Sequence, residues 1–101
     1  MQIIALFNLK EGARRSDYES WARGRDMPTV KGLPSVDKFQ VLRSRNVLFS
    51  EDKPPFDYIE ILDVTSQAAF LEDCGSDAVA ALAKEMSAFT DGATFITTEE
   101  L

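Results

Sequence analysis

Residues 57–64 read DYIEILDV and residues 2–10 read QIIALFNLK, and these two stretches decide the fold. Both are rich in β-branched and aromatic side chains, a composition typical of β-strands. In the second stretch Ile3 and Phe7 have one parity, while Ile4 and Leu6 have the other. An antiparallel sheet with one solvated face should instead alternate apolar and polar residues. The sequence therefore predicts a sheet that is apolar on both faces.

The first helix is predicted from a capping motif. Residues 16–19 read S-D-Y-E, an S-x-x-E capping box whose side chains satisfy backbone N–H groups at a helix start. Pro28 cannot continue that helix cleanly, because it lacks an N–H and clashes with the preceding turn. We therefore expect the helix to end near Asp26 or Met27. Residues 28–34 contain two prolines and a glycine, and we expect them to form an ordered loop.

The remaining sequence predicts a hairpin, two helices and a last strand. Residues 36–49 alternate loosely and pair with the stretch DYIEILDV across a loop at residues 50–56. Ser66 and Ser76 are good N-cap residues for a short helix and a longer one. Residues 93–98 are the last predicted strand. The longer helix carries one apolar stripe, which consists of Val79, Leu82, Ala83, Met86 and Phe89.

The order of these elements is β-α-β-β-α-β, the ferredoxin-like arrangement of an α+β protein. It predicts a single domain over residues 1–101, with a four-stranded antiparallel sheet and helices on one face. The other face would leave a contiguous apolar patch, which soluble monomers rarely tolerate. A second copy is the simplest cover, because closed two-fold dimers are the commonest oligomers. We therefore expect a homodimer that forms through the sheet face.

The composition argues against several classes of function. A net charge of -6 does not suit nucleic-acid binding, which needs clustered Lys and Arg. The chain has no histidine, which removes Ser-His and Cys-His pairs, histidine haem ligands and histidine-containing zinc sites. The glycines form no nucleotide-binding fingerprint, and the acidic runs are typical of solvated surface. We therefore expect no cofactor and no metal site.

The cysteine content and hydropathy indicate the compartment. Cys74 is the single cysteine, so it cannot form an internal disulfide, and we interpret it as a small packing residue. No apolar stretch approaches the length of a membrane span, and residues 1–10 lack the features of a signal peptide. The sequence predicts a cytoplasmic protein that does not associate with membranes.

Six residues are candidates for a ligand-binding site. Three of them are polar residues inside apolar runs, where a buried polar group must either pair internally or face a ligand. Two are aromatic residues on the first helix, and the sixth is a carboxylate at its end. The six are Asn8, Tyr18, Trp21, Asp26, Arg43 and Glu60.

Five of the six candidates also have a structural interpretation, and Asn8 is the exception. Glu60 and Arg43 lie on neighbouring hairpin strands, where they would form an ordinary cross-strand salt bridge. Tyr18 and Trp21 would be core aromatics packed over the sheet, or else the walls of a pocket. Asp26 would either cap the backbone of the following loop or project into a pocket mouth. Asparagine is disfavoured in strands and can both donate and accept hydrogen bonds.

Three segments carry a resemblance to a known family. They read Tyr18-Glu-Ser-Trp-Ala22, then Asp26-x-Pro-Thr-Val-x-Gly-Leu-Pro-Ser-Val36, then Asp57-Tyr-Ile-Glu-Ile61. Together they resemble the RedY-like proteins, and the similarity extends over the whole chain. The resemblance implies a dimeric α+β barrel, a superfamily that includes small cofactor-independent monooxygenases, muconolactone isomerase-like enzymes and EthD-like proteins.

The same resemblance implies a place in biosynthesis. Family members look like accessory proteins of prodiginine pathways, which make red tripyrrole pigments, and they act near the bipyrrole branch or the final condensation. The family supplies no catalytic residue to carry over to this chain. Enzymes of the wider superfamily often use a histidine in the cleft between sheet and helices, and this chain has none.

Three functions remain open from the sequence. The first is an accessory protein that binds an apolar, pyrrole-like intermediate or a partner enzyme, with Trp21, Tyr18 and Asn8 lining an apolar cleft. The second is a cofactor-independent monooxygenase, cyclase or isomerase in which Glu60 or Asp26 is a general base and Asn8 orients the substrate. The third is a structural stabiliser of other pathway proteins. A cavity into which Asn8 and a carboxylate converge would favour the first two, and a collapsed core would favour the third.

Overall fold

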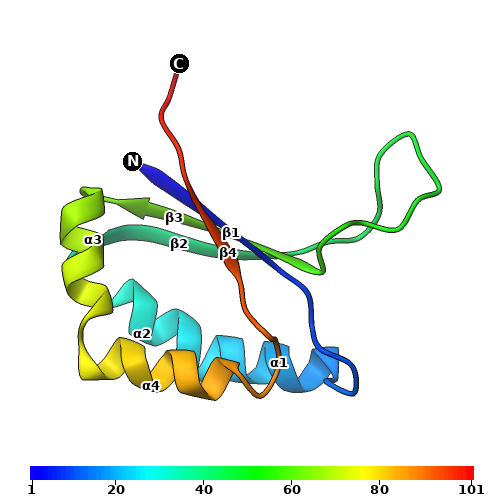
Figure 1. Cartoon of the computed structure of the whole chain (residues 1–101), viewed down its shortest axis with the longest axis horizontal. Helices are drawn as coiled ribbons and strands as arrows, with labels where there is room; N and C mark the ends of the chain where they lie inside the picture. The colour runs from blue at the N-terminus through cyan, green and yellow to red at the C-terminus, as the bar shows by residue number, and fades with distance from the viewer.

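The computed structural model describes residues 1–101 as a four-stranded antiparallel sheet with all of its helices on one face (Figure 1). The strands are β1 (Gln2–Phe7), β2 (Val36–Arg43), β3 (Tyr58–Val64) and β4 (Thr94–Thr97), in the sheet order β2-β3-β1-β4. The helices are α1 (Arg15–Trp21), the π-helix η1 (Ala22–Asp26), α2 (Met27–Lys31), α3 (Gln67–Cys74) and α4 (Asp77–Met86). This arrangement confirms the predicted ferredoxin-like α+β fold.

The first helical segment differs from its prediction at both ends. Arg14 is the N-cap residue of α1 and makes no side-chain cap hydrogen bond, so the predicted capping box is wrong. The segment also continues past Pro28 to Lys31, where a loop was predicted. The wider π-turn explains the continuation, because Met27 donates its backbone N–H to the carbonyl of Ala22, five residues back. Pro28 then falls in the first turn of α2, where a missing N–H costs little.

The second strand ends earlier than the sequence predicts. β2 stops at Arg43, and the hydrogen bond from the Ser44 N–H to the Asp57 carbonyl closes the ladder. The segment that would have to pair with residues 44–49 contains two successive prolines, which cannot donate to a ladder. Residues 44–57 therefore form a long arm that projects beyond the sheet, and Phe49 near its tip is 99% exposed.

The second helical segment confirms its two predicted caps. The Ser66 side chain accepts a hydrogen bond from the Ala69 N–H, and the Ser76 side chain accepts one from the Val79 N–H. Such caps satisfy backbone N–H groups that have no partner inside the helix. Both α3 and α4 begin where the sequence indicates. No helix of the chain is long and apolar enough to cross a bilayer.

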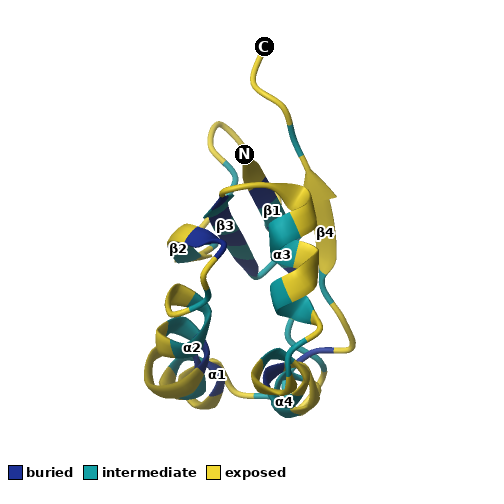
Figure 2. Ribbon diagram, turned by 90° about the vertical axis from the view of Figure 1, so that its left-hand side faces the viewer, coloured by how far each residue is buried: buried dark blue, intermediate teal, exposed yellow.

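The two faces of the sheet differ in cover but not in hydropathy. Toward the helices, alternate residues of β1 and β3 are buried, which Figure 2 shows as dark stretches of these strands. The opposite face, which we call the outer face, has no helix over it (Figure 1). By strand register it carries an apolar patch of half-buried and exposed residues: Ile4, Leu6, Leu42, Ile59, Ile61 and Ile96. The predicted two-sided apolar sheet is confirmed.

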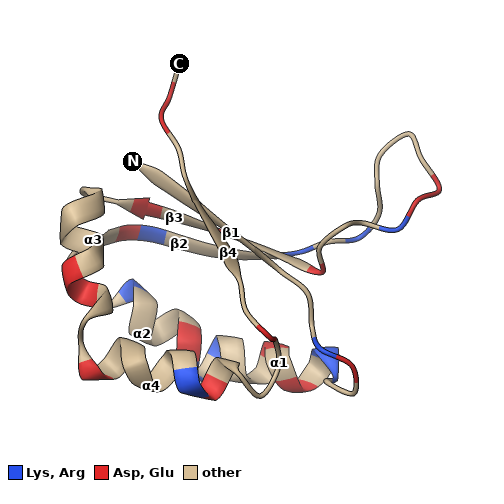
Figure 3. Ribbon diagram, in the orientation of Figure 1, with Lys and Arg blue, Asp and Glu red and all other residues tan.

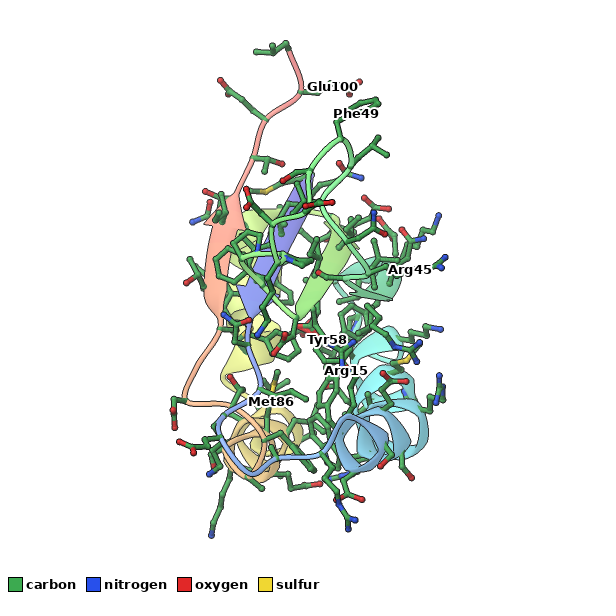
Figure 4. All side chains as sticks on the ribbon, turned by 90° about the vertical axis from the view of Figure 1, so that its right-hand side faces the viewer. Arg15, Arg45, Phe49, Tyr58, Met86 and Glu100 are labelled. Carbon is green, nitrogen blue, oxygen red and sulfur yellow. The ribbon has the colours of Figure 1, made fainter.

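The core beneath the sheet consists of two separate apolar clusters. One contains Ile3, Val36, Phe39, Leu62 and Val64 and contacts α2 and α3. The other contains Phe7, Tyr18, Ala22 and Tyr58 and contacts α4. Arg15 lies over the ring of Tyr58 at the end of the second cluster, 5.3 Å from its centroid (Figure 4). Val41 packs against both clusters, whereas Glu60, opposite it on β3, belongs to neither.

Candidate functional site

A cavity of about 620 Å³ lies between the sheet and the helices. It is lined by 22 residues, of which 14 are hydrophobic. These residues come from all four strands, from η1, α2, α3 and α4, and from the connections between them. This volume and this apolar lining are those of a site for a small organic molecule. Leu71, Gly92 and Phe95 line the cavity and are exposed, so its mouth lies between α3 and β4. Its aromatic walls are Phe39, Phe70 and Phe95.

Glu60 projects into this cavity from the centre of the sheet. Its neighbours in the row across the strands are Val41 on β2 and Ala5 on β1, and Ala5 in turn pairs with Phe95 on β4. Ala5 is small, so it leaves space beside the Glu60 carboxyl. Glu60 is only 5% exposed and makes no side-chain hydrogen bond. Burial, and secondarily the charge of Asp26, raises the pKa of Glu60 from 4.5 to about 8.

Asp26 approaches the same cavity from the helical side. It is the last residue of the π-helix η1, and π-turns are frequent at functional sites. The side chain is 5% exposed, and its Oδ2 atom is buried without a hydrogen-bond partner. Burial raises the pKa of Asp26 from 3.8 to about 6. The predicted alternative, a capping role in a following loop, is wrong, because the helix continues and Asp26 makes no cap hydrogen bond.

Tyr18 adds a third buried polar group beside the two carboxyls. Its ring packs in the second core cluster, with ring-centroid distances of 5.4 Å to Phe7 and 4.7 Å to Tyr58. Its hydroxyl is buried and has no hydrogen-bond partner. Burial, followed by the charges of Glu60 and Asp26, raises the pKa of this hydroxyl. The three groups thus form a polar site in an otherwise apolar interior, and native proteins rarely leave such groups unpaired without a functional reason.

Trp21 and Arg43 lie outside the cavity. The indole Nε1–H of Trp21 donates to Glu85 on α4 at 3.0 Å, and Arg25 binds the same carboxylate. These contacts join η1 and α1 to α4. Figure 3 shows Lys and Arg on the helices, on the connection after β1, on β2 and on the arm.

The predicted cross-strand salt bridge between Glu60 and Arg43 is wrong. In the observed register Arg43 is opposite Tyr58, and Glu60 is opposite Val41. Arg43 instead binds Glu19 on α1, with its Nε 2.7 Å from Glu19 Oε2 and a second, short contact from Nη2. The hydroxyl of Tyr58 donates to the same Glu19 oxygen at 2.7 Å. The Arg43 and Tyr58 hydrogen bonds hold the pKa of Glu19 down at about 2.

Asn8 is exposed and lies just beyond the end of β1. Its Nδ2 donates to the Pro55 carbonyl at 3.1 Å, and its Oδ1 accepts from the Asp57 N–H at 2.9 Å. Its backbone carbonyl accepts from the hydroxyl of Thr90. Asn8 therefore ties the base of the arm and the end of the α4–β4 connection to β1, and it does not line the cavity.

Several cavity residues were not identified as candidates from the sequence. The apolar stripe of α4 supplies Val79, Leu82, Ala83 and Met86 to the lining, and Figure 4 shows Met86 directed from α4 toward the sheet. An apolar stripe of this kind is typical of any helix packed on a core, and only the volume left between it and the sheet makes it a binding surface. Cys74, interpreted as a packing residue, also lines the cavity, and burial raises the pKa of its thiol.

The relatives of the chain agree with this fold and with the sequence resemblance. The family model described as REDY-like protein HapK matches residues 1–101. The chain belongs to the REDY-like HapK family. The crystal structure of HapK from Hahella chejuensis superposes on this HapK-family chain with a TM-score of 0.75 at 26% sequence identity, over 98% of this chain and 93% of the other.

Two more distant structures share the HapK-family fold. SnoaB, a cofactor-independent oxygenase from Streptomyces nogalater, has a TM-score of 0.73 at 16% identity, over 99% of this chain and 93% of that one. A dimeric ferredoxin-like protein from Thermobifida fusca has a TM-score of 0.72 at 10% identity, over 94% of this chain and 85% of that one. At these identities the likeness shows the fold alone. A comparison with curated protein sequences finds no match.

Proposed function

We propose that this chain binds an apolar, pyrrole-like intermediate of prodiginine-type tripyrrole biosynthesis in the cavity between sheet and helices. One observation carries the proposal: a mostly apolar cavity of about 620 Å³ that contains two buried carboxyls, Glu60 and Asp26, with no basic side chain to pair with them. A collapsed core would have favoured a purely structural role, so the cavity counts against the third hypothesis. Membership of the HapK family supports the assignment to this kind of pathway.

The chemistry of the cavity suits a heteroaromatic ligand with N–H groups. Phe39, Phe70 and Phe95 offer aromatic surface for planar rings. Carboxyl oxygens accept hydrogen bonds, and a pyrrole N–H is a donor without an acceptor of its own. A ligand that donates to Glu60 and Asp26 would satisfy oxygens that the folded chain leaves unpaired, which recovers part of their desolvation cost.

A second candidate function is cofactor-independent catalysis on the same ligand. The observation that favours it is again the carboxyl pair, because a pKa of about 8 places the proton of Glu60 close to neutral pH. Groups with a pKa near the working pH are the most effective general acids and bases. In this function Glu60 would remove or return a proton on the bound intermediate. Burial and, secondarily, the charge of Asp26 would set the affinity of Glu60 for that proton.

We further propose that two copies associate through the outer face. Its patch, centred on Ile4 and Ile61 of the two middle strands, has no helix over it. Exposed apolar patches of this kind mark interaction sites, and a two-fold axis through the patch would bury it on both copies at once. A partner enzyme of the pathway is the alternative occupant.

Incubation of the purified chain with a bipyrrole aldehyde and a monopyrrole precursor tests the proposal. We expect saturable binding, measured by calorimetry and by quenching of Trp21 fluorescence. Asp26→Asn removes the carboxyl that is ionised at neutral pH and should weaken binding roughly tenfold, the loss typical of a hydrogen bond to a charged group. Glu60→Gln keeps an acceptor oxygen in place of a protonated carboxyl and should leave the affinity for these neutral ligands nearly unchanged. Glu72→Gln, which removes one charge from an exposed position on α3, is the matched control. Conversion of the precursors that the same two variants abolish would support the catalytic function. Absence of any binding would contradict both functions.

A further inference from the structure

We infer that the cavity selects a cationic ligand: a flat, largely apolar molecule with a positive charge delocalised over N–H groups. The inference rests on the proposed binding function and narrows its ligand class. It comes from the charges that line the cavity and from what neutralises them. A neutral pyrrole would satisfy the apolar walls equally well, so the charge of the ligand is a separate question from its shape.

Every charged residue in the cavity lining is acidic. The lining contains Asp26, Glu60 and, near the mouth, Asp91, and it contains neither Lys nor Arg. An anionic ligand would meet uncompensated negative charge in an apolar environment, which is strongly unfavourable. The cavity therefore discriminates against carboxylates and phosphates, whatever their shape.

Three arginines on the elements that surround this region, η1, α1 and β2, pair with other carboxylates. Arg25 makes a bidentate contact with Glu85, and its Nη2 lies 3.0 Å from Glu85 Oε2. Arg43 binds Glu19, and Arg15 lies 3.6 Å from Asp57. None of these three contacts the carboxyl of Glu60 or Asp26. The chain thus holds two buried acidic groups and supplies no cation for them.

The groups that face Glu60 confirm that its only ionisable neighbours are acidic. Across the sheet its neighbours are Val41 and Ala5. From the helical side the polar groups beside it are Asp26 on η1 and the hydroxyl of Tyr18 on α1. The residues that α4 adds to the same cavity are Val79, Leu82, Ala83, Met86 and, just beyond its end, Ser87. A cationic ligand is the missing partner that would complete this site.

Binding of a cation has a definite proton balance. With pKa values of about 8 for Glu60 and about 6 for Asp26, the empty pair holds one proton at neutral pH, on Glu60. A bound cation stabilises the ionised form of Glu60, so that proton leaves to solvent as the ligand enters. A neutral ligand has no such effect. Affinity for a cation should accordingly rise with pH through the pKa of Glu60, while affinity for a neutral isostere should change little.

Three probes of nearly identical shape test the inference. Naphthalene-2-carboxamidine is a planar cation with N–H donors, naphthalene-2-carboxamide is its neutral isostere, and 2-naphthoate is the corresponding anion. At about pH 8.5 we expect the amidine to bind roughly tenfold or more tightly than the amide, the factor typical of a charged hydrogen bond, and the naphthoate to bind weakest. Calorimetry in two buffers of different ionisation enthalpy at pH 7 should show proton release for the amidine alone.

Variants separate the charge effect from the shape effect. Glu60→Gln should reduce the preference for amidine over amide to a few-fold and abolish proton release, while leaving amide binding nearly unchanged. Glu72→Gln on the exposed face of α3 should leave both preference and proton release intact. If amide and amidine bind the unchanged chain equally, the ligand is neutral and the inference is wrong, although the cavity still binds flat apolar molecules. If none of the three probes binds, the proposed function fails with it.

Discussion

Between pH 6 and pH 9 the free energy of unfolding of the unchanged chain is expected to fall by on the order of 3 kcal/mol because of Glu60 alone. The Glu60→Gln variant is not expected to show this fall. The folded chain holds the Glu60 proton up to a pKa of about 8, whereas the unfolded chain releases it near the ordinary value of 4.5. Folding in this window therefore takes up a proton, and the stability that this proton uptake provides falls as the pH rises. Well above pH 8 the stabilising contribution of the Glu60 proton is lost, because the buried carboxyl is then ionised in the folded chain as well.

Denaturant unfolding of both proteins at several pH values measures this effect. The difference in unfolding free energy between Glu60→Gln and the unchanged chain should grow by on the order of 3 kcal/mol across the window, whatever the glutamine amide itself costs at low pH. Asp26 adds a smaller dependence at lower pH, since burial raises its pKa to about 6. Comparing the two proteins cancels contributions from Cys74 and other shared groups. A Glu72→Gln control should follow the unchanged chain, and a parallel course for Glu60→Gln would show that Glu60 is not buried as described.

Replacing Ile61 with lysine is expected to convert a dimer into a monomer. Ile61 lies on the outer face of β3 opposite Ile4, at the centre of the uncovered apolar patch. In a two-fold interface the substitution appears twice, so two unpaired ammonium groups would have to be buried at the same contact. The dissociation constant should rise by at least about a hundredfold, which corresponds to a loss of about 3 kcal/mol.

Sedimentation velocity over a concentration series checks this result. The unchanged chain should sediment with twice the mass of one chain at micromolar concentration, and Ile61→Lys with the mass of one. Ala80→Lys adds the same charge at an exposed position of α4 and should remain dimeric. Circular dichroism should show that both variants are folded. A monomeric unchanged chain would contradict the proposed sheet-to-sheet dimer and leave the outer face for a different partner.

The fold could be predicted because local and global signals agree in this chain. The two-sided apolar pattern of Ile3, Ile4 and Leu6 predicts a sheet covered on both sides, and Ser66 and Ser76 mark two helix starts that the structure confirms. Local signals misled where one side chain, that of Glu19, had competing partners. Glu19 fits a capping box, yet it pairs with Arg43 and Tyr58 across the fold instead.

The site could be predicted in part for similar reasons. Glu60 is conspicuous as a charge inside an apolar strand, and the structure places it in the cavity. The position of Asp26 depends on a π-turn, whose shifted hydrogen-bond register no residue pattern here announces. Asn8 looked like a pocket residue because the strand was expected to run to Lys10, but β1 ends at Phe7 and leaves Asn8 in a connecting role. A cavity is a volume that packing leaves empty, so the apolar stripe of α4 could not reveal whether it faces core or ligand.

The central claim is that the cavity between sheet and helices is a ligand site centred on Glu60. A crystal structure of the chain soaked with a bipyrrole aldehyde tests it most directly. We expect planar density between Phe95 and α4, with a ligand nitrogen within hydrogen-bond distance of the Glu60 carboxyl and the thiol of Cys74 covered. Density confined to the outer face or to the arm at residues 44–57, with the cavity filled only by side chains, would contradict the claim.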